Sequence, residues 1–237
     1  LFRSLAPLTK LIALLPMPLF FIAMWREMGQ QVHPSRERLR FLLITIPGGL
    51  ILVFLAFLPF GSPFQLLNRL LSEATANGGF SATTLVWLIG RASGLNLPID
   101  LILQVSTLLF ILIAAWLLWR TWRGRPAVRA AADAFAAYLA TAFTFRIWYP
   151  AWLFPWLLLD QEGDPRRLDA GLWFLLCAQL SVVIYGHLHH LIPGFNSLAT
   201  HLVGVPFVFL LPLLMAWGTA RFKRRLGRLR PVNQQSD

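Results

Sequence analysis

Long apolar runs separated by short polar segments dominate the chain. A helix needs about 20 apolar residues to cross a hydrocarbon core of roughly 30 Å, and most of the runs approach that length. The predicted spans are 5–25, 41–60, 98–119, 131–145, 148–159, 171–188 and 202–220. The pattern therefore predicts an all-α fold, a polytopic transmembrane helix bundle with about seven crossings, in a single membrane domain over residues 1–237.

Composition supports a membrane protein and changes the meaning of the charge. The chain is 57% hydrophobic and only 13% charged, with a formal net charge of +11. A basic chain suggests nucleic acid, but these basic residues form short clusters between apolar runs, as the positive-inside rule describes. We therefore expect membrane lipids and no nucleic acid as partners. The single cysteine, Cys177, lies inside an apolar run and is expected to be a small buried hydrophobe.

The basic clusters also orient the chain. Four connectors carry sixteen of the twenty-one lysines and arginines, and they follow Trp25, Trp119, Asp160 and Ala220. They share one side only if the chain crosses seven times, which places the first residue outside and the tail 221–237 in the cytoplasm of a cell-membrane protein. The connector 61–97 then lies outside. The chain opens without a methionine or a signal pattern, so we expect it to be the C-terminal part of a longer protein.

One stretch, FRIWYPAWLFPW from Phe145 to Trp156, places an arginine among aromatic rings. The twelve residues 148–159 reach only about 18 Å as a helix, so they form a short broken-helix pair with the preceding span. The turn between them is predicted to lie below the outer surface, where irregular backbone must face protein or a wet cavity. Alternatively, Trp148, Tyr149 and Trp152 form an interfacial aromatic belt and Arg146 reaches the headgroups.

Arg146 is the strongest candidate for anion binding. A guanidinium inside a span costs roughly 2.5–3.5 kcal/mol on insertion scales, so it is expected to face a partner or an aqueous site. Its planar fork suits a phosphate, and Tyr149 offers a hydroxyl on the same side. Lys10, near the outer end of the first span, is a second candidate cation, although it also serves simply to mark the end of that span.

Histidines concentrate between the sixth span and the loop beyond it. His187 and His190 are three residues apart and would share a helical face, while His189 and His201 lie nearby in sequence. No carboxylate or cysteine lies close enough in sequence to complete a familiar metal site. We therefore predict no metal and no cofactor, and we expect His187 and His190 to line the outer cavity as substrate-binding groups.

The outer connector contains two predicted short helices. Leu67, Leu70 and Leu71 recur at helical spacing, which is typical of a helix lying on the membrane surface. After Asn77-Gly78-Gly79, Ser81 is a candidate N-cap for FSATTLVWLIG, which is too short to cross. The two helices would form either a substrate platform or a packed lid.

Motifs of soluble catalysis are missing from the sequence. It has no phosphate-binding glycine loop, no serine nucleophile elbow and no zinc-protease histidine pair. Glu73 and Asp100 are the only carboxylates predicted outside, and Asp100 is explained by its place at the start of a helix. The catalytic base is therefore unassigned.

Three stretches resemble a known family. They are KLIALLP, FLPFGSPFQLL followed by NGGFSATTL, and FRIWYPAWLFPWLLL, in which Trp148, Tyr149, Trp152 and Pro155 match a WY-x-x-W-x-x-P segment. Together they are similar to the C-terminal portion of GT-C-type integral membrane glycosyltransferases, the class of the polyprenyl-phosphate-sugar-dependent mannosyltransferases. The resemblance implies a lipid-linked sugar donor, chemistry on the extracytoplasmic face, and a catalytic carboxylate in a first outer loop. No such loop precedes Lys10, so the resemblance implies a fragment or an inactive relative.

The predicted function is glycosyl transfer from a polyprenyl-phosphate-linked sugar to an acceptor. Arg146 and Lys10 would contact the phosphate, and the aromatic residues of the short pair would line the sugar or prenyl path. Two alternatives remain. A transporter also uses broken helices, although no inverted repeat is visible. A noncatalytic membrane subunit would use the stripe of Ala132, Ala136 and Ala140 for close packing.

Overall fold

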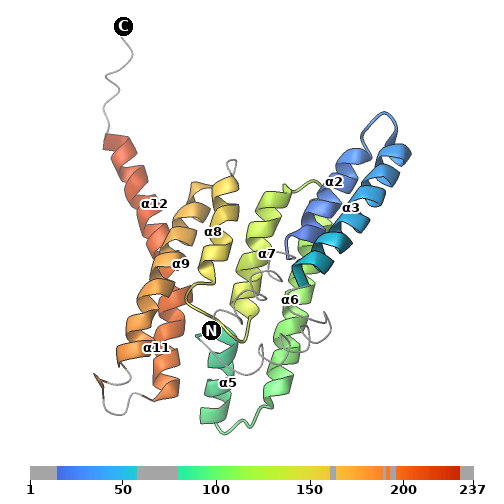
Figure 1. Cartoon of the computed structure of the whole chain (residues 1–237). Coiled ribbons are helices and arrows are strands. Elements are labelled where there is room, and N and C mark those ends of the chain that lie inside the picture. Colours follow the sequence, from blue (N-terminus) through green and yellow to red (C-terminus); the bar gives the residue numbers. More distant parts are fainter. Residues whose placement is uncertain (1–14, 58–79, 161–163, 189–190, 193–195, 230–237) are drawn as a thin grey trace.

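A computed structural model describes residues 15–57, 80–160, 164–188, 191–192 and 196–229 of the chain (Figure 1). Most of these residues are helical, and no strand occurs among them. The α-helices are α2 Met17–Met28, α3 Pro34–Phe57, α5 Ala82–Ala92, α6 Ile99–Trp122, α7 Ala127–Thr141, α8 Pro150–Leu159, α9 Pro165–Val183, α11 Ser197–Phe209 and α12 Leu211–Leu229. A π-helical turn, η2 (Ile184–Leu188), continues α9. The all-α prediction is confirmed.

Three helical stretches in the described part of the chain are long and apolar enough to cross a membrane. They are Ile99–Trp122, Pro165–Leu188 and Ser197–Phe222. Large apolar side chains along α6 are about half exposed, from Leu101 to Trp122. A water-soluble chain rarely leaves so continuous an apolar surface uncovered. The protein is therefore read as a membrane protein.

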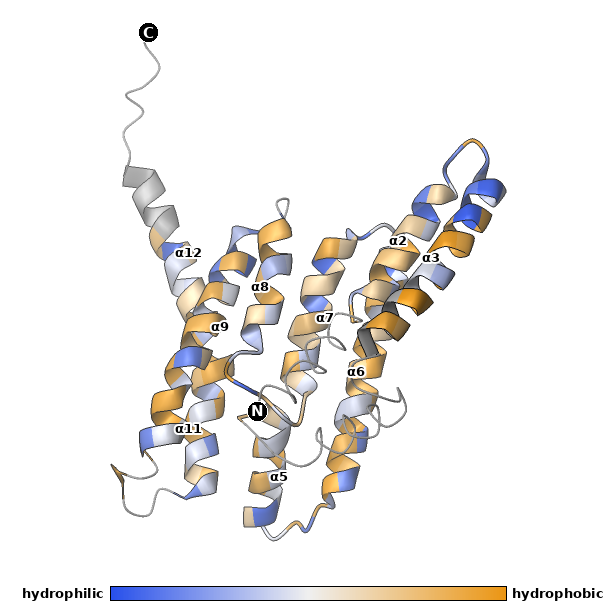
Figure 2. Ribbon diagram, in the orientation of Figure 1, coloured by the Kyte–Doolittle hydropathy of each residue, from blue (hydrophilic) through white to orange (hydrophobic). Residues whose placement is uncertain are grey.

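The basic connectors gather at one end of the helical array. Figure 1 shows the α2–α3 loop, the α6–α7 loop, the start of α9 and the far end of α12 at the top, whereas α5 lies at the bottom. Blue, hydrophilic segments mark the top of α2 and α3 in Figure 2, and orange segments run along the middle of α6. We call the top the basic end and the bottom the α5 end.

Alanines of α7 form the centre of the packing. Ala130, Ala131 and Ala134 are almost fully buried and pack with Leu19 of α2 and Leu117 of α6. Side chains of this size let neighbouring helix backbones approach closely, which is the common device between membrane helices.

The predicted alanine stripe is only partly a packing face. Ala132 is buried in the second cluster of core residues, which also contains Phe135 and Tyr149. Ala136 and Ala140 are exposed. The stripe therefore does not pack as a unit inside the chain.

The last predicted span, 202–220, lies within the apolar stretch Ser197–Phe222. A one-residue interruption at Leu210 divides this stretch into α11 and α12. Pro212 explains the break because it has no N–H and its ring crowds the carbonyl four residues earlier. The helix α12 then runs to Leu229, so the predicted tail 221–237 begins as a helix. Its residues 221–229 are rich in lysine, arginine and leucine and contain no proline, which favours that continuation.

Candidate functional site

A non-helical turn, residues 142–149, joins the short helices α7 and α8. The helix α7 has 15 residues and α8 has 10, so they reach about 22 and 15 Å. Pro150 opens α8, where its missing N–H costs nothing. The predicted short pair is therefore present, although α7 spans 127–141 rather than 131–145. The turn contains Arg146 and Trp148 and ends at Tyr149.

Hydroxyl groups of α5 hold the carbonyls at the start of this turn. The last carbonyls of a helix have no partner within the helix. The Thr83 hydroxyl donates to the Thr141 carbonyl at 2.9 Å, and the Ser81 and Thr84 hydroxyls donate to the Phe143 carbonyl at 2.6 and 2.9 Å. All three donors are buried. The Ser81 side chain also accepts from the Thr84 N–H, which confirms the predicted N-cap.

The rest of the turn packs against other helices. The Gln179 side chain of α9 donates to the Ile147 carbonyl at 2.9 Å. The Phe145 ring is buried, and its centre lies 5.2 Å from the Phe209 ring of α11 and 6.1 Å from the Phe174 ring of α9. Irregular backbone at membrane depth requires such protein contacts. The turn is therefore held in place by contacts with α9 and α11.

Replacing Ser81 by alanine should loosen this attachment. The variant loses the helix cap and one donor to the Phe143 carbonyl, so we expect it to lower the free energy of unfolding by about 1 kcal/mol. The change in the detergent-solubilised protein is measured from its thermal midpoint. Ser106→Ala is the matched control because its hydroxyl only bonds the Leu103 carbonyl of its own helix. Equal shifts in the two variants would show that the α5 attachment contributes nothing.

Four predicted site residues lie together at the turn. The guanidinium of the exposed Arg146 side chain lies beside the hydroxyl of the buried Tyr149. The Tyr149 ring stacks on Trp152 with centres 4.3 Å apart and an interplanar angle of 22°. Trp148 is 39% exposed, and its ring meets the Tyr149 ring edge-on at 6.3 Å. An accessible guanidinium is thus positioned beside an aromatic surface.

Two of the four predicted histidines lie in the described part of the chain. His187 is exposed on the π-helical turn η2, and its predicted pairing with His190 stays a prediction because His190 lies outside the described residues. His201 is buried in α11, with Nδ1 2.7 Å from the Ser197 carbonyl and its ring 5.3 Å from the Phe80 ring. Its contacts are those of a packed structural histidine.

Several predicted residues lie outside the described part of the chain. These are Lys10, Glu73, His189, His190 and the surface helix expected near Leu67 to Leu71. Asp100 is exposed in the first turn of α6, which agrees with its predicted place at the start of a helix, although no side chain caps this helix. No group of three or more histidine, cysteine, aspartate or glutamate side chains that could hold a metal occurs within the described segments.

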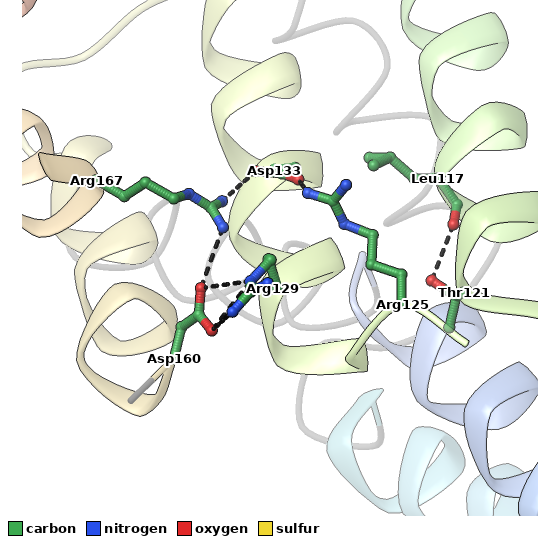
Figure 3. A network of polar contacts seen from close by, with 7 residues as sticks. All are labelled: Leu117, Thr121, Arg125, Arg129, Asp133, Asp160 and Arg167. Carbon is green, nitrogen blue, oxygen red and sulfur yellow. Dashed lines mark hydrogen bonds and ion pairs between the residues drawn. The ribbon is translucent and has the colours of Figure 1, made fainter. Parts of the chain in front are cut away.

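The acidic residues that the sequence analysis passed over form a network at the basic end (Figure 3). The Asp160 carboxylate at the end of α8 accepts from Arg129 at 3.1–3.2 Å and from Arg167 at 3.1 Å. Asp133 of α7 is paired with Arg125 and again with Arg167. The network ties the starts of α7 and α9 to the end of α8. The network therefore has a structural role. The occurrence of arginines and aspartates together around these helix ends is the feature of the sequence that could have predicted it.

Comparisons of the chain with protein-family models, with curated proteins and with solved structures found no match.

Proposed function

We propose that the chain is a seven-crossing membrane protein that binds the phosphate of a lipid-linked sugar at its α5 end and serves glycosyl transfer. The membrane assignment rests on the three long apolar helices. The gathering of the basic connectors at one end supports the crossing number, because that end would face the cytoplasm under the positive-inside rule. The α5 end would then be extracytoplasmic, with the C-terminus inside.

The observation that carries the proposal is the position of Arg146. Its guanidinium is exposed at a turn between two helices that are each too short to cross a core of roughly 30 Å. The turn would therefore lie within the membrane thickness, where an accessible cation is costly unless it meets an anion or water. A phosphate anchored in the same leaflet by a prenyl chain meets that requirement, and a guanidinium can grip two of its oxygens at once.

The surrounding side chains suit the rest of such a ligand. The Tyr149 hydroxyl lies beside the Arg146 guanidinium and can accept a hydrogen bond from it, which would limit the freedom lost when a phosphate binds. The Trp148 ring and the stacked Tyr149–Trp152 pair provide flat apolar surfaces of the kind that sugars and prenyl chains contact. In a transfer reaction Arg146 would neutralise the departing polyprenyl phosphate. The family resemblance supplies the reaction class, and the base that deprotonates the acceptor is unassigned.

Arg146→Ala tests the proposal through ligand binding. In the full-length protein in detergent, we expect the dissociation constant for polyprenyl monophosphate to rise about tenfold, because a charge-assisted hydrogen bond is lost. Arg91→Ala is the matched control. Arg91 is also an exposed arginine at the α5 end, and it lies over the Trp87 ring at 5.8 Å. It should change the constant less than twofold.

The same variants separate binding from chemistry. Turnover of a polyprenyl-phosphate-linked sugar should fall with Arg146→Ala and persist with Arg91→Ala. Unchanged binding and turnover in an Arg146→Ala protein that expresses normally would remove Arg146 from the site. Flux of the lipid across a vesicle membrane without sugar transfer would instead favour a transporter.

A further inference from the structure

The far end of α6 lies at the basic end of the array, away from the Arg146 turn (Figure 1). Two arginines there lie over tryptophan rings one helical turn earlier. The Arg120 guanidinium carbon is 5.3 Å from the centre of the Trp116 ring, and that of Arg123 is 5.3 Å from the centre of the Trp119 ring. Positions 116, 119, 120 and 123 share one face of the helix. They form a double arginine–tryptophan stack.

This stack is exposed and not neutralised by the chain. Arg120 and Arg123 are exposed, and Trp116 and Trp119 are 48% and 51% exposed. Within the described segments, the ion pairs involve other arginines and none reaches Arg120 or Arg123. The opposite side of the same helix holds the buried Leu117 and Thr121. The core thus fixes α6 with both guanidiniums turned outward.

An apolar stripe leads along the helix to the stack. Leu101, Val105, Leu108 and Leu112 follow one another at three- and four-residue steps on this face, and each is 46–59% exposed. From Leu101 to Trp119 the stripe extends about 27 Å, close to the thickness of a hydrocarbon core. Such a face is expected to be covered by acyl chains. The two stacked arginines lie at the end of this face, at the level of the lipid headgroups.

We infer that the α6 face binds an anionic phospholipid of the leaflet at the basic end, with its acyl chains along Leu108 and Leu112 and its phosphate on Arg120 and Arg123. Charge complementarity decides the headgroup. A zwitterionic lipid would bring an ammonium group toward two guanidiniums, whereas phosphatidylglycerol brings only negative charge. Stacking on the indoles restricts both guanidiniums, as it does for Arg38 over Trp25 at 5.1 Å. Among the described residues, α6 is where two such stacks share one helix face.

The test uses the full chain in detergent micelles, with the thermal midpoint followed as phosphatidylglycerol or phosphatidylcholine is added. We expect phosphatidylglycerol to raise the midpoint in a saturable way and phosphatidylcholine to give no saturable rise. In the double variant R120Q/R123Q, the half-saturating concentration of phosphatidylglycerol should increase about tenfold. Because both arginines are exposed and unpaired by carboxylates in the described segments, the variant should keep the midpoint of the unmodified protein before lipid is added.

The matched control is R36Q/R40Q. Arg36 and Arg40 are exposed at the start of α3, also at the basic end, and the described residues place neither over an aromatic ring. This variant removes the same charge and should shift half-saturation less than twofold. Equal shifts in the two double variants would reduce the effect to general surface charge and overturn the site. The site would also be overturned if phosphatidylcholine raised the midpoint as much as phosphatidylglycerol does. An unchanged half-saturating concentration in R120Q/R123Q would overturn it as well.

Discussion

Replacing Asp160 by alanine is expected to lower the free energy of unfolding by about 3 kcal/mol. The Asp160 side chain is only 6% exposed and accepts hydrogen bonds from both Arg129 and Arg167. Removing it leaves two guanidiniums facing each other without their shared carboxylate. The two arginine side chains are 28% and 27% exposed, so water solvates part of their charge in the variant. The expected loss of stability is therefore at the low end of the range for breaking a buried ion pair.

The loss is measured by reversible unfolding in mixed micelles. Asp160→Asn keeps the side-chain shape and removes the charge, so it should lose roughly half as much as alanine. Asp100→Ala is the control for removal of a carboxylate. Asp100 is exposed in the first turn of α6, and its loss should cost less than about 1 kcal/mol. An Asp160→Ala protein as stable as Asp100→Ala would mean that the network does not hold α7, α8 and α9 together.

A methyl group added at Gly204 is expected to lower the free energy of unfolding by about 2 kcal/mol. A Cβ at this position of α11 would lie 2.6–2.9 Å from Cε1, Cζ and Cδ1 of the Phe80 ring. Phe80 is 4% exposed and also contacts the His201 ring, so it has little room to move. It directly precedes Ser81, the cap of α5. Displacing the ring should therefore disturb the hydroxyl contacts with the 142–149 turn as well.

The control makes the same substitution where space is free. Nothing lies within 4 Å of a Cβ built at Gly218 of α12, so Gly218→Ala should be neutral or stabilising by up to about 1 kcal/mol. Thermal midpoints of the two variants should therefore move in opposite directions or differ clearly in size. The double variant Gly204→Ala/Phe80→Leu removes the ring atoms that clash and should recover part of the loss. A Gly204→Ala protein with an unchanged midpoint would contradict the close approach.

Hydropathy predicts a helix well where one uninterrupted apolar run defines it. The span 98–119 was predicted from its unbroken apolar run and corresponds to α6, Ile99–Trp122. The short pair was predicted because seven crossings require a span at 148–159 and these twelve residues reach only about 18 Å. In the structure α8 begins two residues later, at Pro150. The interruption at Leu210 was not predicted, because the leucines, valines and phenylalanines around Pro206 and Pro212 keep the average hydropathy of the segment high. Window averaging hides such a break.

The contacts that build the candidate site were less accessible to sequence reasoning. Arg146, Tyr149 and Trp152 lie within seven residues, so their grouping could be predicted from local spacing. The bond from Ser81 to the Phe143 carbonyl joins positions 62 residues apart, and the capping pattern predicted only the local half of what Ser81 does. The same applies to Gln179, whose partner carbonyl lies 32 residues earlier. Such pairs depend on how helices pack, which periodicity alone does not determine.

The attachment of α5 to the turn also sets an order of events during synthesis. The hydroxyls of Ser81, Thr83 and Thr84 leave the ribosome about sixty residues before the carbonyls that accept their hydrogen bonds. Until α7 is in place, these three groups can bond only to water or to their own helix. The N-terminal half of the described chain therefore emerges with its docking surface unsatisfied, and α7 completes it on arrival. In a chain arrested on the ribosome before Thr141 is made, α5 should be undocked, with the hydroxyls of Ser81, Thr83 and Thr84 lacking their carbonyl acceptors.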